Sequence, residues 1–313
     1  MTGCDRKTRR WWMAGSRFGG IRTQELQVRR LSWFLLLAFG LPWMFWWLLI
    51  LEVIKVPGLA GQPDGDVPVL TLVAVAPLSL AAQFGPAIGG LGVTGFTEGR
   101  VGVGALLARL YRLWLPLRWL LVALMMFPVM WAVAGLSVMA VGGDSSAVRM
   151  GSIGAFTVAL IGESLFSGIG EEVGFRGYLL PRLQSRWTAL QASVILGLIW
   201  GVWHLPLSVF PGQPQEGQAI WWMLCWQIVV AVFFTWIYNV TGGSLLAVVL
   251  LHGSANAASE LVLLEDVSEN QLLIVFAAVA AFIVLLFGSS LEDSSRLRKA
   301  RSWVKSRAQV RHL

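Results

Sequence analysis

Apolar residues fill most of the chain in long segments, and short polar connections separate these segments. A helix that crosses a bilayer needs about 20 consecutive, predominantly apolar residues. Eight segments satisfy this condition, and we predict a transmembrane helix in each. They comprise residues 31–54, 67–91, 119–142, 153–182, 188–207, 219–240, 244–264 and 270–289. The second segment is the least regular, because Pro68, Pro77 and Pro86 interrupt it.

The pattern predicts an all-α, polytopic membrane protein with one transmembrane domain of about eight helices. We expect a basic N-terminal segment at residues 1–30, the transmembrane domain at 31–289 and a basic tail at 290–313. The composition agrees, since 56% of the residues are hydrophobic and only 13% are charged. Soluble domains carry about 25% charged residues. A soluble globular enzyme is therefore excluded.

The basic residues indicate how the bundle is oriented. If the N-terminus is cytoplasmic, 22 of the 24 Lys and Arg residues lie in or beside cytoplasmic segments, as the positive-inside rule requires. The composition of residues 100–118 is that of an amphipathic interfacial helix, although a solvated connection explains this segment more simply. We expect a multi-pass protein of the plasma membrane with both termini in the cytoplasm. Its basic segments favour contact with anionic lipids rather than with nucleic acid.

Ionisable side chains occur inside three of the predicted spans. Each costs about 2.5–3.5 kcal/mol on insertion scales, so each needs an explanation. The polar residues of these spans are Glu171, Glu172 and Arg176 in the fourth, His204 in the fifth, and His252 and Asn256 in the seventh. A rise of about 1.5 Å per residue places all of them near the middle of the membrane. We therefore expect an intramembrane cavity that these side chains line.

Spacing separates the two glutamates of the fourth span. Glu172 and Arg176 are four residues apart and predict a structural ion pair. Glu171 is rotated by about 100° from Glu172 on a helix, which leaves Glu171 available for chemistry. Gly170 and Gly174 form a small-xxx-small pattern, and this pattern predicts the close approach of a neighbouring helix.

The remaining polar groups suit hydrolysis of a peptide bond. A carboxylate beside an imidazole can deprotonate water and then protonate the leaving amine, a role that fits Glu171 with His204. An imidazole beside an amide can stabilise the oxyanion, a role that fits His252 with Asn256, which share one helix face. Alternatively, Glu171, His204 and His252 can hold zinc with an open position for water. The chain has no H-E-x-x-H motif.

Structural roles are the alternative for each of these groups. A single histidine in a span commonly forms hydrogen bonds in the core, and a Glu–Arg pair or a small-xxx-small pattern is common between membrane helices. However, such a role rarely requires two histidines, two glutamates and an asparagine on three helices at one depth. The combination therefore favours a functional site.

The same residues resemble the CPBP family of intramembrane proteases, which includes CAAX proteases and bacteriocin-processing enzymes. The family pattern is E-E-x-x-x-R, then F-x-x-x-H, then H-x-x-x-N/D, on successive helices. The chain matches it with Glu171, Glu172 and Arg176, with His204 after an aromatic residue, Trp200, and with His252 and Asn256. The resemblance covers residues of about 150–265, which we take as the core of the domain.

This resemblance implies an endopeptidase that acts on a membrane-associated peptide or protein, of the CAAX or the bacteriocin type. It implies that Glu171 and His204 activate water, that His252 and Asn256 bind the oxyanion, and that Glu172 and Arg176 support them. The family is described as metalloproteases, but whether zinc takes part stays open. The sequence looks bacterial, which disfavours a prenylated substrate.

Two other functions are compatible with the sequence. A family member can act without proteolysis, as an immunity or scaffold protein in the membrane. A transporter can also use intramembrane Glu and His as proton or metal sites, but transporters commonly contain inverted repeats, and none is visible in this sequence.

Overall fold

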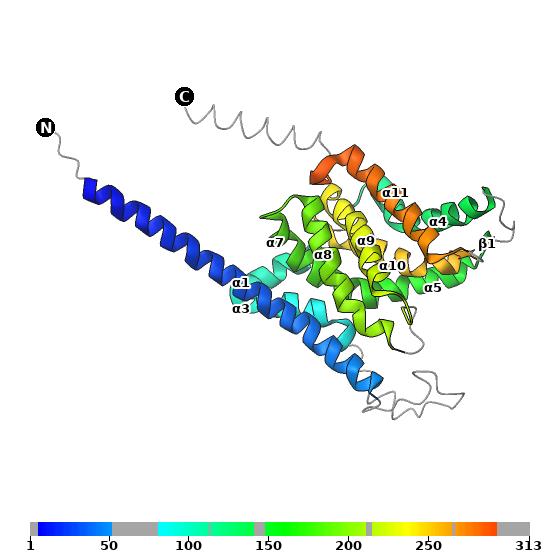
Figure 1. Cartoon of the computed structure of the whole chain (residues 1–313), viewed down its shortest axis with the longest axis horizontal. Helices are drawn as coiled ribbons and strands as arrows, with labels where there is room; N and C mark the ends of the chain where they lie inside the picture. Colours follow the sequence, from blue (N-terminus) through cyan, green and yellow to red (C-terminus); the bar gives the residue numbers. More distant parts are fainter. Residues whose placement is uncertain are drawn as a thin grey trace.

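The structure is a computed structural model that describes residues 6–51, 81–112, 114–140, 148–210, 215–264 and 267–292, with side chains from residue 26 onward. Helices make up nearly all of this part of the chain (Figure 1). The longer ones are α1 (Arg6–Ile50), α3 (Gly85–Leu107), α4 (Leu117–Ala140), α5 (Ile153–Glu163), α8 (Ala189–His204), α9 (Ile220–Val240), α10 (Leu245–Leu261) and α11 (Glu269–Phe287).

Short elements connect or extend the long helices. Between α5 and α8 the chain stays helical through π-helical η2 (Ser164–Gly168), α6 (Ile169–Glu172), π-helical η3 (Val173–Leu179) and α7 (Leu180–Gln184). The 3₁₀ turns η4 (Leu205–Ser208) and η5 (Gly288–Ser290) follow α8 and α11. Strands β1 (Val148–Met150) and β2 (Val262–Leu264) form an antiparallel pair in which Arg149 lies opposite Leu263.

Within the described residues, six helical segments are long and apolar enough to cross a membrane, which confirms the all-α, polytopic prediction. They are Leu26–Ile50, Leu117–Ala140, Ile153–Gln184, Ala189–Ser208, Ile220–Val240 and Glu269–Ser290. The shorter apolar helix α10 occupies the predicted span at 244–264. Seven of the eight predicted segments are therefore helical in the structure, and the small β1–β2 pair was not predicted.

The predicted second span at 67–91 is corrected in part. Residues 67–80 lie outside the described residues, but α3 begins at Gly85 and continues to Leu107, beyond the predicted end of the span at residue 91. Pro86 does not interrupt this helix, because proline is tolerated in the first helical turn. Gly99 has a φ of +66° and breaks α3. The helix considered at 100–118 accordingly ends at Leu107.

Helix α10 has a central position in the bundle. It packs against α4 and α5 on one side and contacts η2, α6, η3 and α9 on others. The remaining large contacts join α8 to α9 and α1 to α3. Because α10 carries His252 and Asn256, this position surrounds its polar residues with the helices that carry the other predicted site residues.

Candidate active site

The glutamates lie on a helical run whose hydrogen-bonding pattern changes twice. The short α-helix α6, which contains Glu171 and Glu172, is flanked by the π-helical segments η2 and η3. A π-helical segment adds a residue to the turn and is frequent at functional sites, because it changes the direction of the side chains. Glu171, Glu172 and Arg176 are all buried, with at most 3% of any of them exposed. These π-helical segments were not predicted from the sequence.

Two glycines allow the helices to come close at this point. A Cβ atom on Gly174 would overlap the carbonyl group of Pro86, at the start of α3. A Cβ on Gly253 would overlap the hydroxyl of Ser164 in η2. The approach predicted from Gly170 and Gly174 is therefore confirmed. Gly253 brings α10 equally close to η2 and so places its neighbour, His252, beside the glutamates.

A buried ion pair and an imidazole form the innermost part of the site. Arg176 Nη1 donates to Glu172 Oε1 at 2.9 Å, which confirms the predicted pair. The same oxygen lies 2.8 Å from His252 Nδ1. Since a carboxylate only accepts hydrogen bonds, Nδ1 carries the hydrogen. The Arg176 guanidinium also lies 4.3 Å and 4.5 Å from the ring centroids of Trp200 and Phe234, where cation–π attraction helps to stabilise the buried charge.

Glu171 faces the other nitrogen of the same imidazole. Its Oε1 lies 3.9 Å from His252 Nε2, and its Oε2 accepts a hydrogen bond of 2.5 Å from Trp200 Nε1. The sequence-based hypothesis paired Glu171 with His204 instead. Consecutive glutamates thus contact opposite edges of His252, and the 3.9 Å separation is suitable for one bridging water molecule.

His204 is held by its own helix and lies beside α9. Its Nδ1 lies 2.9 Å from the carbonyl oxygen of Trp200 and 3.2 Å from Gln227 Nε2. The carbonyl can only accept, so Nδ1 donates to it, the Gln227 amide nitrogen is a neighbour rather than a second partner of Nδ1, and Nε2 is the nitrogen that can act on a ligand. Gln227 was not predicted as a site residue, although a single polar residue inside an apolar span was a visible signal.

Asn256 lies one helical turn further out on α10 than His252. Its Nδ2 donates to Glu163 Oε2 at 2.8 Å, and Ser167 Oγ donates to the same oxygen at 2.7 Å. The sequence left the roles of Glu163 and Glu260 open. Glu163 lines the cavity described next, whereas Glu260 is exposed outside it and its carbonyl accepts a hydrogen bond from the backbone of Ser152.

One cavity of about 610 Å³ contains all four residues that were predicted to be catalytic. Aromatic side chains make up much of its wall. Its polar lining comprises Gln83, Glu163, Ser167, Glu171, His204, Gln215, Gln218, Gln227, His252, Asn256, Ser259 and Glu269. The three helices that were predicted to bring polar groups to one depth therefore do so around one space.

The zinc alternative rests on Glu171, His204 and His252. No three His, Cys, Asp or Glu side chains of the described ranges lie together as a metal-binding group. His252 Nδ1 is engaged by Glu172 and His204 Nδ1 by a carbonyl, so the Nε2 atoms of both rings are the ones that could bind a ligand. Zinc at these three residues stays a prediction.

The part of the chain that carries the site matches known proteins. Residues 153–258 match the family model described as "Type II CAAX prenyl endopeptidase Rce1-like". This segment is therefore similar to the CAAX prenyl endopeptidases. A relative named "CAAX prenyl protease 2", from Methanococcus maripaludis, is 28% identical over 127 residues, which make up 38% of this chain and 47% of the relative. The match thus spans about half the length of that relative. The family match falls on the motif-bearing core predicted at 150–265.

Proposed function

We propose that this protein is an intramembrane endopeptidase that hydrolyses a peptide bond of a membrane-associated protein. The observation that supports it most is the position of Glu171, buried within the cavity with its carboxylate 3.9 Å from His252 Nε2. A buried carboxylate beside an imidazole is suited to activate water. The family match adds support, because it covers the helices that carry all four residues.

In the proposed reaction, one water molecule occupies the space between Glu171 Oε1 and His252 Nε2. Glu171 removes a proton while the water oxygen bonds to the carbonyl carbon of the scissile bond. The tetrahedral intermediate then breaks its carbon–nitrogen bond, and Glu171 returns the proton to the amine that leaves. The products are a carboxylic acid and an amine, so atoms and charge balance.

His252 is a positioning group for this water. Its Nδ1 is fixed by Glu172, which is itself paired with Arg176. In the neutral ring, Nε2 accepts one hydrogen of the water while Glu171 accepts the other. Both hydrogens are then held away from the substrate, and the oxygen lone pairs point towards the carbonyl carbon.

One donor is available for the oxygen that becomes negative. The Asn256 amide has two hydrogens, and Glu163 engages one of them, which leaves the other for the oxyanion. His204 carries its ring hydrogen on Nδ1, so its Nε2 accepts hydrogen bonds in the neutral ring and can donate to this oxygen only in the protonated ring. Preorganised donors of this kind are worth about 10²–10³ in rate each.

The decisive experiment compares cells that carry the wild-type chain with cells that carry Glu171→Gln. Gln keeps the size of the side chain and can still accept from Trp200, but it cannot act as a base. We expect one or more membrane proteins to be cleaved only in the wild type, detected by proteomics of membrane fractions. Glu292→Gln is the matched control, because Glu292 lies outside the cavity. Cleavage that persists in Glu171→Gln would support the immunity or scaffold function instead.

Metal involvement is tested separately from the choice of substrate. Purified protein is analysed for bound zinc, and cleavage is measured with and without a chelator. The geometry favours activity that is independent of zinc, with Glu171 and His252 alone positioning the water. Stoichiometric zinc that is lost in His204→Ala and His252→Ala would instead establish the metal site.

A further inference from the structure

The two ends of the helical bundle differ in charge. At one end, here called the basic end, lie the connections at residues 108–116, 185–188 and 241–244. Hydrogen bonds of arginines tie its helices together, since Arg109 donates to Tyr238 and Arg182 donates to Glu98. The described arginines near this end are Arg29, Arg30, Arg100, Arg109, Arg112, Arg118, Arg182 and Arg186.

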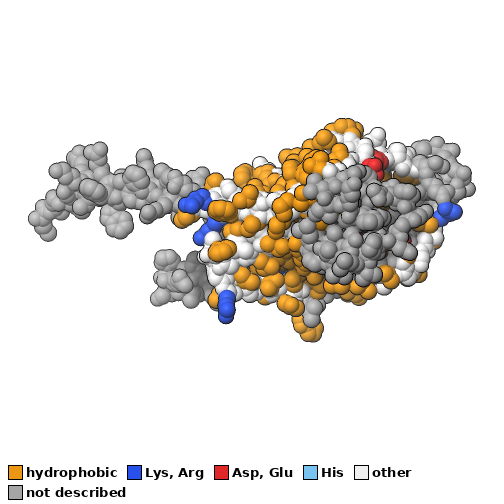
Figure 2. Space-filling view, turned by 90° about the horizontal axis from the view of Figure 1, so that it is seen from below, with side chains coloured by type: hydrophobic (Ala, Val, Ile, Leu, Met, Phe, Trp, Pro, Cys, Tyr) orange, Lys and Arg blue, Asp and Glu red, His pale blue; other side chains and the backbone are white. Residues whose placement is uncertain are grey.

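The opposite end carries acids instead. It holds η4, the β1–β2 pair and the first turns of α9 and α11, and we call it the cavity end. Its described acidic residues are Glu216, Glu260 and Glu269, and Arg149 is its one described basic residue. Figure 2 shows most of the blue Lys and Arg side chains at the left-hand end, beyond a broad hydrophobic surface. The positive-inside rule therefore assigns the basic end to the cytoplasm.

The cavity opens at the end of the bundle that holds η4 and the first turns of α9 and α11. Its deepest polar residues are Glu171 and His252, whereas its outermost lining includes Gln218, Ser259 and Glu269. Gln218 Nε2 donates to Glu269 Oε1 at 3.0 Å in an exposed position, so this pair marks the mouth. Among the described residues of the connections at the basic end, none lines the cavity.

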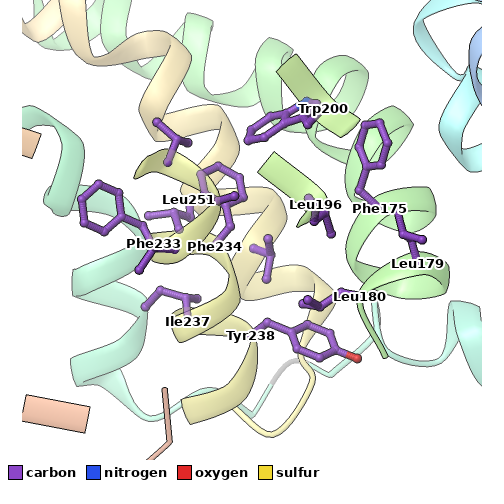
Figure 3. Packing of buried hydrophobic residues seen from close by; sticks show 14 of the residues in the cluster. Phe175, Leu179, Leu180, Leu196, Trp200, Phe233, Phe234, Ile237, Tyr238 and Leu251 are labelled. Atoms are coloured by element: carbon purple, nitrogen blue, oxygen red, sulfur yellow. The ribbon is translucent and has the colours of Figure 1, made fainter. Parts of the chain in front are cut away.

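Packed side chains close the route to the basic end. Phe175, Leu180 and Ile237 lie between the site and that end, and all three are fully buried. Figure 3 shows them with Trp200 in one continuous cluster of aromatic and aliphatic groups. Protein interiors packed in this way leave few voids larger than a water molecule, so a peptide cannot reach Glu171 from the cytoplasmic end.

The described lining of the cavity also has one sign of charge. It contains the carboxylates Glu163, Glu171 and Glu269 and no Lys or Arg among the residues that the structure describes. A cleft lined by one sign of charge raises the local concentration of ligands of the opposite sign. Glu163 lies between the mouth and Glu171, so the acids follow the entry route.

We infer that the cavity opens on the extracytoplasmic side of the membrane and there receives a positively charged segment of a membrane-anchored polypeptide. The side of opening depends only on the charges and on the packing. The nature of the segment rests on the proposed endopeptidase function, and it narrows the substrate to proteins whose cleavage site is exposed outside the cytoplasm.

The side of opening is tested by labelling cysteines in intact cells. Cys4 and Cys225 are first replaced by serine, and single cysteines are then introduced by Ser259→Cys at the mouth and Ser185→Cys at the basic end, both at exposed positions. We expect a membrane-impermeant maleimide to label Ser259→Cys in intact cells and Ser185→Cys only after lysis. Gln218→Cys provides a second position at the mouth. The reverse pattern would overturn the inference.

The charge of the segment is tested by photo-crosslinking to the purified full chain in detergent. The probes are two palmitoylated peptides that carry the same photoreactive group and either four lysines or four glutamates. We expect several-fold more crosslinking of the lysine peptide, less of it in Glu269→Gln, and no change in the matched control Glu292→Gln. Salt should reduce the preference, since exposed charges are screened. Equal crosslinking of the two peptides would overturn this part.

Failure of this inference is distinguishable from failure of the proposed function. Neither labelling nor crosslinking requires a peptide bond to be broken. A chain that captures the lysine peptide from the extracytoplasmic side but cleaves nothing contradicts only the endopeptidase. A chain that cleaves in a Glu171-dependent manner but labels from the cytoplasm contradicts only the side of opening.

Discussion

Two polar contacts, here called the inner and the outer bridge, join α10 to the helical run that contains α5 and α6. They have the same length but lie at different depths in the bundle. In the inner bridge, Glu172 Oε1 lies 2.8 Å from His252 Nδ1, and in the outer bridge, Glu163 Oε2 accepts from Asn256 Nδ2 at 2.8 Å. The inner carboxylate is fully buried, whereas Asn256 is exposed in the cavity.

The difference between these bridges shows that distance alone does not indicate the cost of losing a contact. Water can replace a lost partner at the outer bridge, but the partners of the inner bridge have no such replacement. We therefore expect the inner bridge to determine folding and the outer bridge to affect mainly the reaction. Four predictions test this division.

The largest effect is expected from Arg176→Met, which removes the cation of the inner bridge. Glu172 then remains as a buried charge without its partner, and such changes cost about 3–5 kcal/mol of unfolding free energy. Denaturant unfolding in detergent measures the loss. The double variant Glu172→Gln with Arg176→Met is the control and should recover most of it. An equal loss in both variants would show that packing rather than charge sets the cost.

Asn256→Ala should affect catalysis far more than stability. Removal of one oxyanion donor lowers the rate by about 10²–10³, while an exposed position changes the unfolding free energy by about 0.5 kcal/mol or less. The rate is measured on the substrate found by the membrane proteomics. Ser259→Ala, one turn further along the same helix, is the control and should keep the rate. If Asn256→Ala instead unfolds the protein, the division between the bridges is wrong.

Trp200→Phe isolates the hydrogen bond to Glu171 and keeps an aromatic ring beside Arg176. Loss of a hydrogen bond to a charged group costs about 1.5–3 kcal/mol of unfolding free energy. Trp203→Phe is a matched control on the same helix, because Trp203 Nε1 donates to the neutral carbonyl of Ala38 at 2.9 Å. Its loss should cost only about 0.5–1.5 kcal/mol. Equal losses would mean that the charge of Glu171 does not strengthen its bond.

The smallest effect is expected from Glu163→Gln in the outer bridge. Gln can still accept from Asn256, and solvent reaches this part of the cavity, so the unfolding free energy should change by about 0.5 kcal/mol or less. The same substitution at the inner bridge, Glu172→Gln, leaves Arg176 without its buried anion and should cost several times more. Similar changes in the two variants would remove the distinction between the bridges.

Much of the fold was predictable because hydrophobic length is a local property. The spans that contain α4, α8, α9 and α11 agree with the apolar segments to within a few residues. The prediction was wrong in detail at α3, where proline was interpreted as an interruption. Whether Pro86 breaks a helix or begins one depends on where the preceding turn lies, and the hydropathy pattern does not contain that information.

Which residues form the site was also predictable, whereas the contacts between these residues were not. The cost of placing Glu171, His204 and His252 in a membrane made them stand out in the sequence. The spacing of Glu172 and Arg176 indicated their ion pair. However, Glu171 lies beside His252, Trp200 donates to Glu171, and Gln227 lies beside His204, and none of these contacts was predicted. The π-helical segments around α6 and the close approach at Gly253 set these contacts.

The sequence by itself determined that this is a helical membrane protein and which residues lie in its interior, and its basic residues predict which end faces the cytoplasm. These properties follow from hydrophobicity and charge, which each residue contributes regardless of its partners. Only the tertiary structure decided that one imidazole lies between two glutamates and that the cavity opens away from the basic end. Those contacts depend on helix rotation and on approaches of a few ångströms between distant segments, which backbone packing determines.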